Sequence, residues 1–278
     1  MLQVYRTSPK AGERIAYIGS ASDSRETPHY RIEVDPAARY QTILGFGGAI
    51  TESAAYTLNR LPGPVRRSVL QAYYAPGRGN CYTMGRLHIN SCDFSLENYS
   101  YVDDNDTRLG SFDISREARW VIPTVQEAGA LAGRPLFLLA SPWSPPAWMK
   151  SNGRMNGGGT LLPEFRQTWA EYYIRYVQAM AERGLHIDAL TVQNEPAAEQ
   201  LWDSCLYSAA EERDFVRDYL GPALEGSGAP GSGLKLLIWD HNRDVVFERA
   251  RRVLSDKAAA RYVWGVGHHC TSPRSSKT

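Results

Sequence analysis

One stretch of the chain, Leu190 to Pro196, combines the pattern of a buried strand with a carboxylate that could do chemistry. Glu195 follows the apolar residues directly and stands beside the amide of Asn194. Pro196 favours an extended backbone at the residue before it and cannot continue a hydrogen-bonded ladder, so we expect Glu195 to be extended and to end the strand. A carboxylate at the C-terminal end of a barrel strand is in position for catalysis. A glutamate here could instead cap a helix or form an ion pair, and this motif alone leaves both readings open.

The elements that would position this carboxylate come from an alternation of apolar runs and helical patterns. Between the runs, apolar periodicity predicts helices at residues 164–183, 208–220 and 244–254, the second with a capping-box spacing at its start. The runs are apolar on both faces, which is typical of parallel strands covered by helices, so the fold class is α/β. Short alternating segments at residues 3–5 and 30–34 predict an accessory β layer. The six expected strands are residues 42–50, 82–89, 136–140, 190–192, 234–239 and 262–266.

Polar residues follow almost every one of these runs, and this decides between an open sheet and a barrel. Polar groups that converge from the ends of several parallel strands favour a (β/α)8 TIM barrel. The groups are Arg86 to Asp93, Ser141 to Trp143, Asn194 with Glu195, Asp240 to Asn242, and His268 with His269.

Composition and motifs exclude several other classes of protein. The net charge is +1, which gives no electrostatic footprint for nucleic acid, and no run approaches the ~20 apolar residues of a membrane helix. The glycine-rich turn at Gly45 to Gly48 lacks the third glycine of a dinucleotide site and is followed by no phosphate-binding lysine. His268 and His269 are neighbours on a strand and would point to opposite faces, so we predict no metal site.

Four blocks of the chain carry a resemblance to a known family. Together they closely resemble the motifs of glycoside hydrolase family 30, and the chain looks most similar to the bacterial glucosylceramidase-type β-glucosidases among its members. The resemblance extends over residues 30–269, in order and at sensible separations. The blocks are GFGGAITE at residues 45–52, RLHINSCDFS at 86–95, ASPWSPPAWMK at 140–150 and TVQNEP at 191–196.

The resemblance implies a retaining β-glycosidase on a TIM barrel with a β-sandwich side domain. Residues 1–40 would supply N-terminal strands of the sandwich, and residues 41–269 part of the barrel. Retention needs two carboxyl groups about 5 to 5.5 Å apart, an acid/base and a nucleophile. Glu195 matches the acid/base. It must stay protonated near neutral pH, so we expect burial and an approaching carboxylate to raise its pKa.

The resemblance also implies a set of sugar-binding residues and no cofactor. Asn194 would bind the sugar 2-hydroxyl, Asp93 would accept hydrogen bonds from two hydroxyls, and Trp143 would offer an apolar wall. Arg86 would orient carboxylates from below, and His269 matches a histidine at the end of the sixth strand. The full predicted substrate-binding set is Arg86, Asp93, Trp143, Asn194, Asp240, Asn242 and His269, with Asp240 and Asn242 the weaker candidates for hydroxyl contacts.

The resemblance stops after His269, where residues 270–278 form a polar tail unlike the family. About six of the eight barrel strands are expected, and no residue takes the place of the family's nucleophile on the seventh strand. We therefore expect a truncated chain with an unpaired strand edge that is inactive by itself. With no apolar leader the chain as written is expected to be cytoplasmic, or secreted if its true start lies upstream.

Several alternatives stay open at this stage. The chain could be a catalytically dead carbohydrate-binding remnant, or it could prefer β-1,6-glucan or xylan to a glucoside or glycolipid. An open-sheet hydrolase with another nucleophile is disfavoured, because no Gly-x-Ser-x-Gly elbow occurs in the sequence. The sequence indicates neither the leaving group nor the oligomeric state.

Overall fold

A computed structural model of the chain describes residues 3–20, 30, 32–226 and 233–269. It divides into two compact units, with the division between Ile43 and Leu44. In the first unit, β1 (Gln3–Ser8) and β2 (Glu13–Ser20) form an antiparallel hairpin, with η1 (Pro9–Ala11) between them. The strand expected at residues 3–5 is therefore confirmed. The β-sandwich to which it was assigned stays a prediction.

The second strand expected near the N-terminus, at residues 30–34, is wrong. The described residues of this stretch, 30 and 32–34, are exposed and irregular. A β-strand forms by pairing with a neighbouring strand. In the part of the chain that the structure describes, β1 and β2 pair with each other alone, and residues 30 and 32–34 pair with neither.

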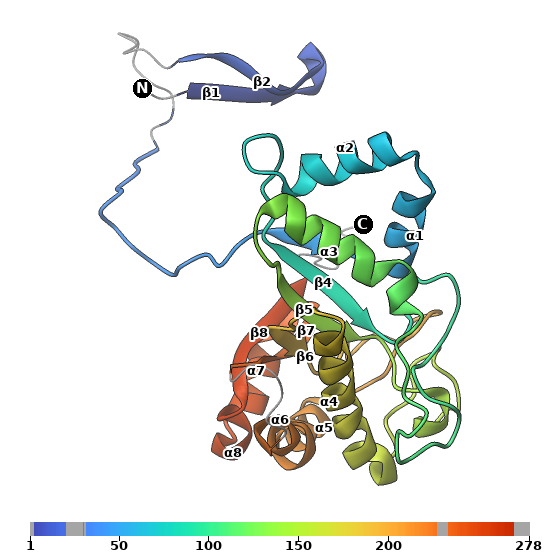
Figure 1. Cartoon of the computed structure of the whole chain (residues 1–278). Helices are drawn as coiled ribbons and strands as arrows, with labels where there is room; N and C mark the ends of the chain where they lie inside the picture. Colours follow the sequence, from blue (N-terminus) through green and yellow to red (C-terminus); the bar gives the residue numbers. More distant parts are fainter. Residues whose placement is uncertain (1–2, 21–29, 31, 227–232, 270–278) are drawn as a thin grey trace. The chain divides into compact units, whose positions relative to one another are not determined.

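The second unit contains a six-stranded sheet in the order β3-β4-β5-β6-β7-β8, with every neighbouring pair parallel (Figure 1). Strand order equals chain order, which is the topology of a barrel wall made from successive βα units, here forming a half-barrel. This confirms the predicted fold class and the six expected strands. The strands are β3 (Gly47–Ala49), β4 (Met84–Ile89), β5 (Phe137–Pro142), β6 (Ala189–Thr191), β7 (Lys235–Asn242) and β8 (Val263–His269).

Helices connect these strands, and Figure 1 shows α1 to α3 gathered beside β4 and α4 to α8 beside the later strands. The predicted helices are all present, and Ser208 forms the expected capping box with Glu211 at the start of α5. No described helix has the length and apolar content to cross a membrane. The described helices are α1 (Glu52–Arg60), α2 (Gly63–Tyr74), α3 (Val121–Ala132), α4 (Arg166–Glu182), α5 (Ala209–Phe215), α6 (Gly221–Gly226), α7 (Val246–Leu254) and α8 (Lys257–Ala260), with the π-helical turn η5 (Val216–Leu220) and the short 3-10 turns η2 (Glu117–Arg119), η3 (Ala147–Met149), η4 (Pro163–Phe165) and η6 (Arg243–Val245).

The glycine-rich turn before α1 has a packing role. A Cβ atom at Gly47 would collide with the carbonyl oxygen of Met84 in the adjacent β4. Only glycine lets the two backbones approach this closely, and the register Gly47 to Met84 begins the β3–β4 ladder. This turn therefore sets the position of β3, which leads directly to Thr51 at the sheet's C-terminal edge.

Helix α4 presents an aromatic face that is entirely buried and ties the helix to the sheet. The Tyr173 hydroxyl donates to the Val192 carbonyl at 2.6 Å, and the Tyr172 hydroxyl donates to the Asn90 side-chain oxygen. A buried phenol must find such an acceptor, so each bond fixes the helix against a specific strand end. Because Val192 and Asn90 lie just after β6 and β4, α4 holds the two loops that carry the candidate site residues.

Candidate active site

Glu195 lies just beyond the C-terminal end of β6, in a backbone conformation that the sequence did not predict. Its φ is 49°, in the left-handed region, so the expected extended conformation is wrong. The cause is tertiary: the Glu195 N–H donates to the Asp240 carbonyl at 3.0 Å, and the Asn194 N–H donates to the Pro142 carbonyl at 2.8 Å. These bonds from both neighbouring strands outweigh the local preference set by Pro196. A strained non-glycine residue at a strand end is typical of a functional site.

A second backbone distortion lies in the adjacent strand, β7. Trp239 and Asp240 both have positive φ, 73° and 44°, and the β7–β8 register shifts at this point. Such a bulge re-aims a side chain that a regular strand would send elsewhere. It brings the Asp240 carboxylate onto Thr191, whose hydroxyl donates to it at 2.8 Å, and onto Ser141 at 3.0 Å.

Four charged groups from four strands or strand ends form one continuous chain of contacts, which we call the cleft network: Arg86, Asp240, His269 and Glu195. Arg86 donates to Asp240 Oδ2 at 2.7 Å. His269 places Nε2 3.0 Å from Asp240 Oδ1 and Nδ1 3.1 Å from Glu195 Oε1. Both ring nitrogens face carboxylate oxygens, so both act as donors and the ring is an imidazolium.

The pKa values of the cleft network follow from these contacts. Two hydrogen bonds raise the pKa of His269 to about 9, and the bond to Asp240 has a larger effect than the bond to Glu195. Although burial alone would raise it, the charges of Arg86 and His269 hold the pKa of Asp240 well below its usual range. The hydrogen bond from His269, assisted by Gln200, outweighs burial and lowers the pKa of Glu195. The expectation of a raised pKa for Glu195 is therefore wrong, because its nearest charge is a cation and not a second carboxylate.

A cleft of about 340 Å³ opens above the cleft network. It brings together six of the eight predicted site residues from segments far apart in the sequence. Asp240 lies beneath the cleft, with both carboxylate oxygens engaged by the protein. Asn242 is not among the lining residues; its carbonyl accepts from the Trp239 indole at 2.8 Å, and its proposed sugar contact stays a prediction. The lining residues are Ala49, Thr51, Arg86, Asp93, Phe94, Trp143, Asn194, Glu195, Gln200, Trp202 and His269.

The sugar-binding candidates are held in fixed orientations. Arg86 donates to the Asn194 side-chain oxygen at 2.8 Å, which leaves the N–H groups of that amide on the opposite side. The Arg86 guanidinium also lies 4.6 Å from the ring centroid of Trp143, a cation–π contact over a buried indole. Burial raises the pKa of Asp93, and the charge of Glu195 raises it further. Among the residues lining the cleft, Asp93 and Glu195 are the carboxylates.

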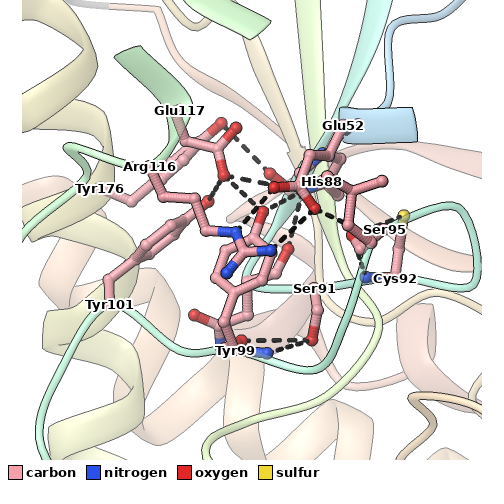
Figure 2. Close-up of polar contacts among 12 residues, drawn as sticks. Glu52, His88, Ser91, Cys92, Ser95, Tyr99, Tyr101, Arg116, Glu117 and Tyr176 are labelled. Carbon is pink, nitrogen blue, oxygen red and sulfur yellow. Dashed lines mark hydrogen bonds and ion pairs between the residues drawn. The ribbon is translucent and has the colours of Figure 1, made fainter. Parts of the chain in front are cut away.

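The loop that carries Asp93 is supported from behind by a second cluster, which we call the buried network: Glu52, His88, Tyr99, Arg116 and Glu117 (Figure 2). Glu52 accepts from Arg116 at 2.7 Å and from the Leu96 N–H at 2.8 Å. The Ser53 N–H donates to the Phe94 carbonyl at 2.9 Å. These bonds pin the segment after Asp93 to the start of α1, so the carboxylate of Asp93 is carried on a rigid support.

Gln200 and Trp202 line the cleft, and neither was predicted as a site residue from the sequence. The Gln200 amide donates to Glu195 Oε2 at 3.1 Å, so the two oxygens of Glu195 have different partners. Both residues lie in an irregular loop after β6, where no periodicity indicates which side chains face the site. The one available signal was a tryptophan in a polar stretch, which is unusual outside a binding surface. Among the described residues no group of three potential ligands could hold a metal ion.

Comparison with known proteins decides the family. The model of the glycosyl hydrolase family 30 TIM-barrel domain matches residues 43–278. The chain belongs to glycosyl hydrolase family 30. Among family 30 structures, SrfJ from Salmonella typhimurium is 36% identical, with a TM-score of 0.87 over 95% of this chain and 59% of that chain. The endo-β1,6-glucanase BT3312 is 30% identical, with a TM-score of 0.77 over 84% of this chain and 53% of that one.

Curated relatives give the same family with two different activities. The lysosomal acid glucosylceramidase of Mus musculus is 36% identical over 94% of this chain and 52% of its own length. The endo-1,6-β-D-glucanase of Neurospora crassa is 34% identical over 89% of this chain and 52% of its own length. The chain therefore spans about half the length of the curated relatives it matches.

Proposed function

We propose that this chain carries the acid/base half of a retaining β-glycosidase site, with Glu195 as the acid/base and a β-glucoside as substrate. The observation that carries the proposal is the position of Glu195: it lines the cleft with one oxygen on His269 and the other on Gln200, beside the amide of Asn194. A glycosidase needs a carboxyl group that can give a proton to the leaving oxygen and later take one from water.

The cleft network supplies the proton for this step. Before the transfer the proton resides on His269, 3.1 Å from Glu195 Oε1, because two carboxylates stabilise the imidazolium. Transfer to Glu195 gives the carboxylic acid, and His269, then neutral, stays fixed by Asp240. Negative charge brought near Glu195 by a second carboxylate would favour this transfer. Asp240 has no oxygen to spare for substrate, so we assign it to positioning His269 and Arg86.

The remaining predicted residues would bind the sugar that precedes the scissile bond. The Asn194 amide N–H groups suit the 2-hydroxyl, Asp93 can accept from two hydroxyls, and Trp143 offers an apolar face. Glucose is the sugar named by both activities among the relatives, a glucosylceramidase and an endo-1,6-β-D-glucanase. This supports a β-glucosidic bond as the target.

Hydrolysis with retention also requires a nucleophile, and we propose that this carboxylate is not among the groups of this cleft. Asp93 is the other carboxylate of the lining, and we assign it to the hydroxyls of the sugar and not to attack on the anomeric carbon. The chain is then expected to bind a β-glucoside without turning it over. A carbohydrate-binding remnant would behave in the same way, so binding and turnover must be measured separately.

The test combines calorimetry with an activity assay on the 278-residue chain. We expect methyl β-D-glucoside to bind, Asp93→Asn to weaken binding at least about tenfold because a charged hydrogen-bond acceptor is lost, and Glu248→Gln, on the exposed face of α7, to change nothing. Absence of binding by the wild type contradicts the proposed site. Hydrolysis of 4-nitrophenyl β-D-glucoside that Glu195→Gln abolishes contradicts the missing nucleophile, because this polypeptide would then contain both carboxylates.

A further inference from the structure

Trp202 is a large aromatic side chain that lines the cleft and yet stays 40% exposed. It takes no part in the acid/base step or in the binding of the sugar described above. An indole left open to solvent inside a cleft offers a flat apolar surface of the kind that ligands cover. Its position seven residues after Glu195 links it to the reacting group.

The contacts of Glu195 indicate which part of a substrate would meet Trp202. One carboxyl oxygen is held by His269, on the side of the cleft network, and the other is held by Gln200. The acid gives its proton to the leaving oxygen, so the leaving group must lie against Glu195. Arg86 contacts both Asn194 and Trp143, and these three residues make up the side that receives the first sugar. The loop of Gln200 and Trp202 is then the side of the leaving group.

The loop that carries Trp202 is fixed in place before any ligand binds. The Ser204 hydroxyl accepts from the Gln200 N–H at 3.2 Å and from the Gly158 N–H at 2.9 Å. Lys150, which is buried, donates to the Ser204 carbonyl at 2.5 Å. A rigid platform binds more tightly than a flexible one because less conformational entropy is lost on binding.

Asp203, the neighbour of Trp202, gives the loop a further attachment. Its buried carboxylate accepts from the Ser91 hydroxyl at 2.6 Å and from the Asn98 amide at 2.9 Å. Ser91 belongs to the segment that leads to Asp93. The loop of the leaving-group side and the loop of the first sugar are therefore joined through a buried carboxylate.

We propose that Trp202 is the platform for the leaving group and that this leaving group is a second sugar ring, so the substrate class is a β-linked oligosaccharide of glucose. This inference rests on the proposed function. The flat C–H face of a pyranose matches an indole, and its hydroxyls need polar neighbours. The cleft provides them, because Thr51 and Gln200 line it together with Trp202. An alkyl chain would leave these polar groups without partners.

The experiment compares three probes by calorimetry on the 278-residue chain: methyl β-D-glucoside, gentiobiose and hexyl β-D-glucoside. The first carries only the first sugar, the second adds a sugar ring, and the third adds an alkyl chain. We expect gentiobiose to bind roughly fivefold to tenfold more tightly than methyl β-D-glucoside, the gain given by one aromatic contact. Trp202→Ala should remove this gain and leave the affinity for methyl β-D-glucoside unchanged.

Two control variants make the result specific. Trp202→Phe keeps a flat ring and should retain most of the gain. Trp264→Ala removes an indole of β8 that is 54% exposed and does not line the cleft, and it should change no affinity. Unchanged binding of methyl β-D-glucoside by Trp202→Ala demonstrates that the variant is folded.

The outcomes separate this inference from the proposed function. If the wild type fails to bind methyl β-D-glucoside, the proposed function fails and the platform with it. If that probe binds but gentiobiose gains nothing, or the gain survives in Trp202→Ala, only the platform is overturned. If hexyl β-D-glucoside gains more than gentiobiose and Trp202→Ala removes that gain, the assignment of a sugar leaving group is overturned in favour of an alkyl one.

Discussion

The cleft network and the buried network each contain a histidine beside carboxylates, and the surroundings of these two histidines differ. His269, in the cleft network, has carboxylate oxygens at 3.0 and 3.1 Å from its two ring nitrogens. His88, in the buried network, accepts from the Glu52 backbone N–H at Nε2 and donates to the Asn90 carbonyl from Nδ1, at 3.1 and 2.7 Å. Two backbone partners fix one neutral tautomer, whereas two carboxylates stabilise the charged ring.

The difference separates a supporting cluster from a reactive one. In the buried network Glu117 has as its donors the hydroxyls of Tyr99 and Tyr101, at 2.6 and 2.9 Å, and burial raises the pKa of both phenols (Figure 2). Both phenols therefore keep their protons near neutral pH. In the cleft network the protonated ring of His269 contacts Glu195, whose carboxylate lines the cleft. We infer that one network maintains geometry and the other moves a proton.

The largest expected effect comes from breaking the buried network. Glu117→Ala leaves two buried phenol donors without an acceptor, and we expect it to reduce the free energy of unfolding by about 3 kcal/mol. Urea denaturation measures this. Glu117→Gln, which keeps an acceptor oxygen, should lose about 1 kcal/mol. A loss below about 1 kcal/mol for the alanine variant would show that the network does not support the fold.

Stability as a function of pH tests the cleft network. The pKa of His269 is about 9 in the folded chain, above its usual 6.5. Its stabilising contribution is therefore fully present below about pH 6.5 and is lost as the pH rises through about 9. Because the ring is partly open to solvent, we expect about 1 to 2 kcal/mol. Urea denaturation between these pH values should give a decline for the wild type that is absent in His269→Gln.

A third prediction concerns the hydrogen bond that raises the pKa of His269. The largest cause is the hydrogen bond to Asp240, so Asp240→Asn should lower the titration midpoint of His269 to below about pH 8. Nitrogen-15 NMR of the imidazole rings follows the titration. His88 serves as the internal control, because its two backbone hydrogen bonds do not involve Asp240 and its ring signals at pH 7 should be the same in both proteins. An unchanged midpoint for His269 would assign its charge to Glu195 instead.

Sequence patterns predicted the elements and most of the cluster, and the reasons are local. Each strand is encoded by its own apolar run, and parallel strands meet at one edge, so Arg86, Asn194, Glu195 and His269 had to converge. The backbone conformation and lowered pKa of Glu195 could not be read in this way. Both are imposed by β7 and β8, through the Asp240 carbonyl and the His269 ring.

The residues of the β6–α5 loop were unpredictable for a different reason. Gln200 and Trp202 lie in irregular backbone, where no repeat of apolar residues reports which side chains face inward. Their direction is set by Asp203 and Ser204, whose partners come from loops near residues 91 and 158. Only the folded chain brings these segments together.

The smallest expected effect concerns Arg116, which forms one buried and one exposed ion pair, so that each pair serves as the control for the other. Arg116 binds Glu52, whose side chain is 4% exposed, and Glu97, whose side chain is 70% exposed, at 2.7 and 2.8 Å. Water screens the outer pair, so Glu97→Gln should change the free energy of unfolding by less than about 0.5 kcal/mol. Glu52→Gln should lose about 1 to 2 kcal/mol, since the inner pair is charged and shielded from water. Equal losses in urea denaturation would mean that burial does not distinguish the two pairs, and that the rigid support of the Asp93 loop does not depend on the inner carboxylate.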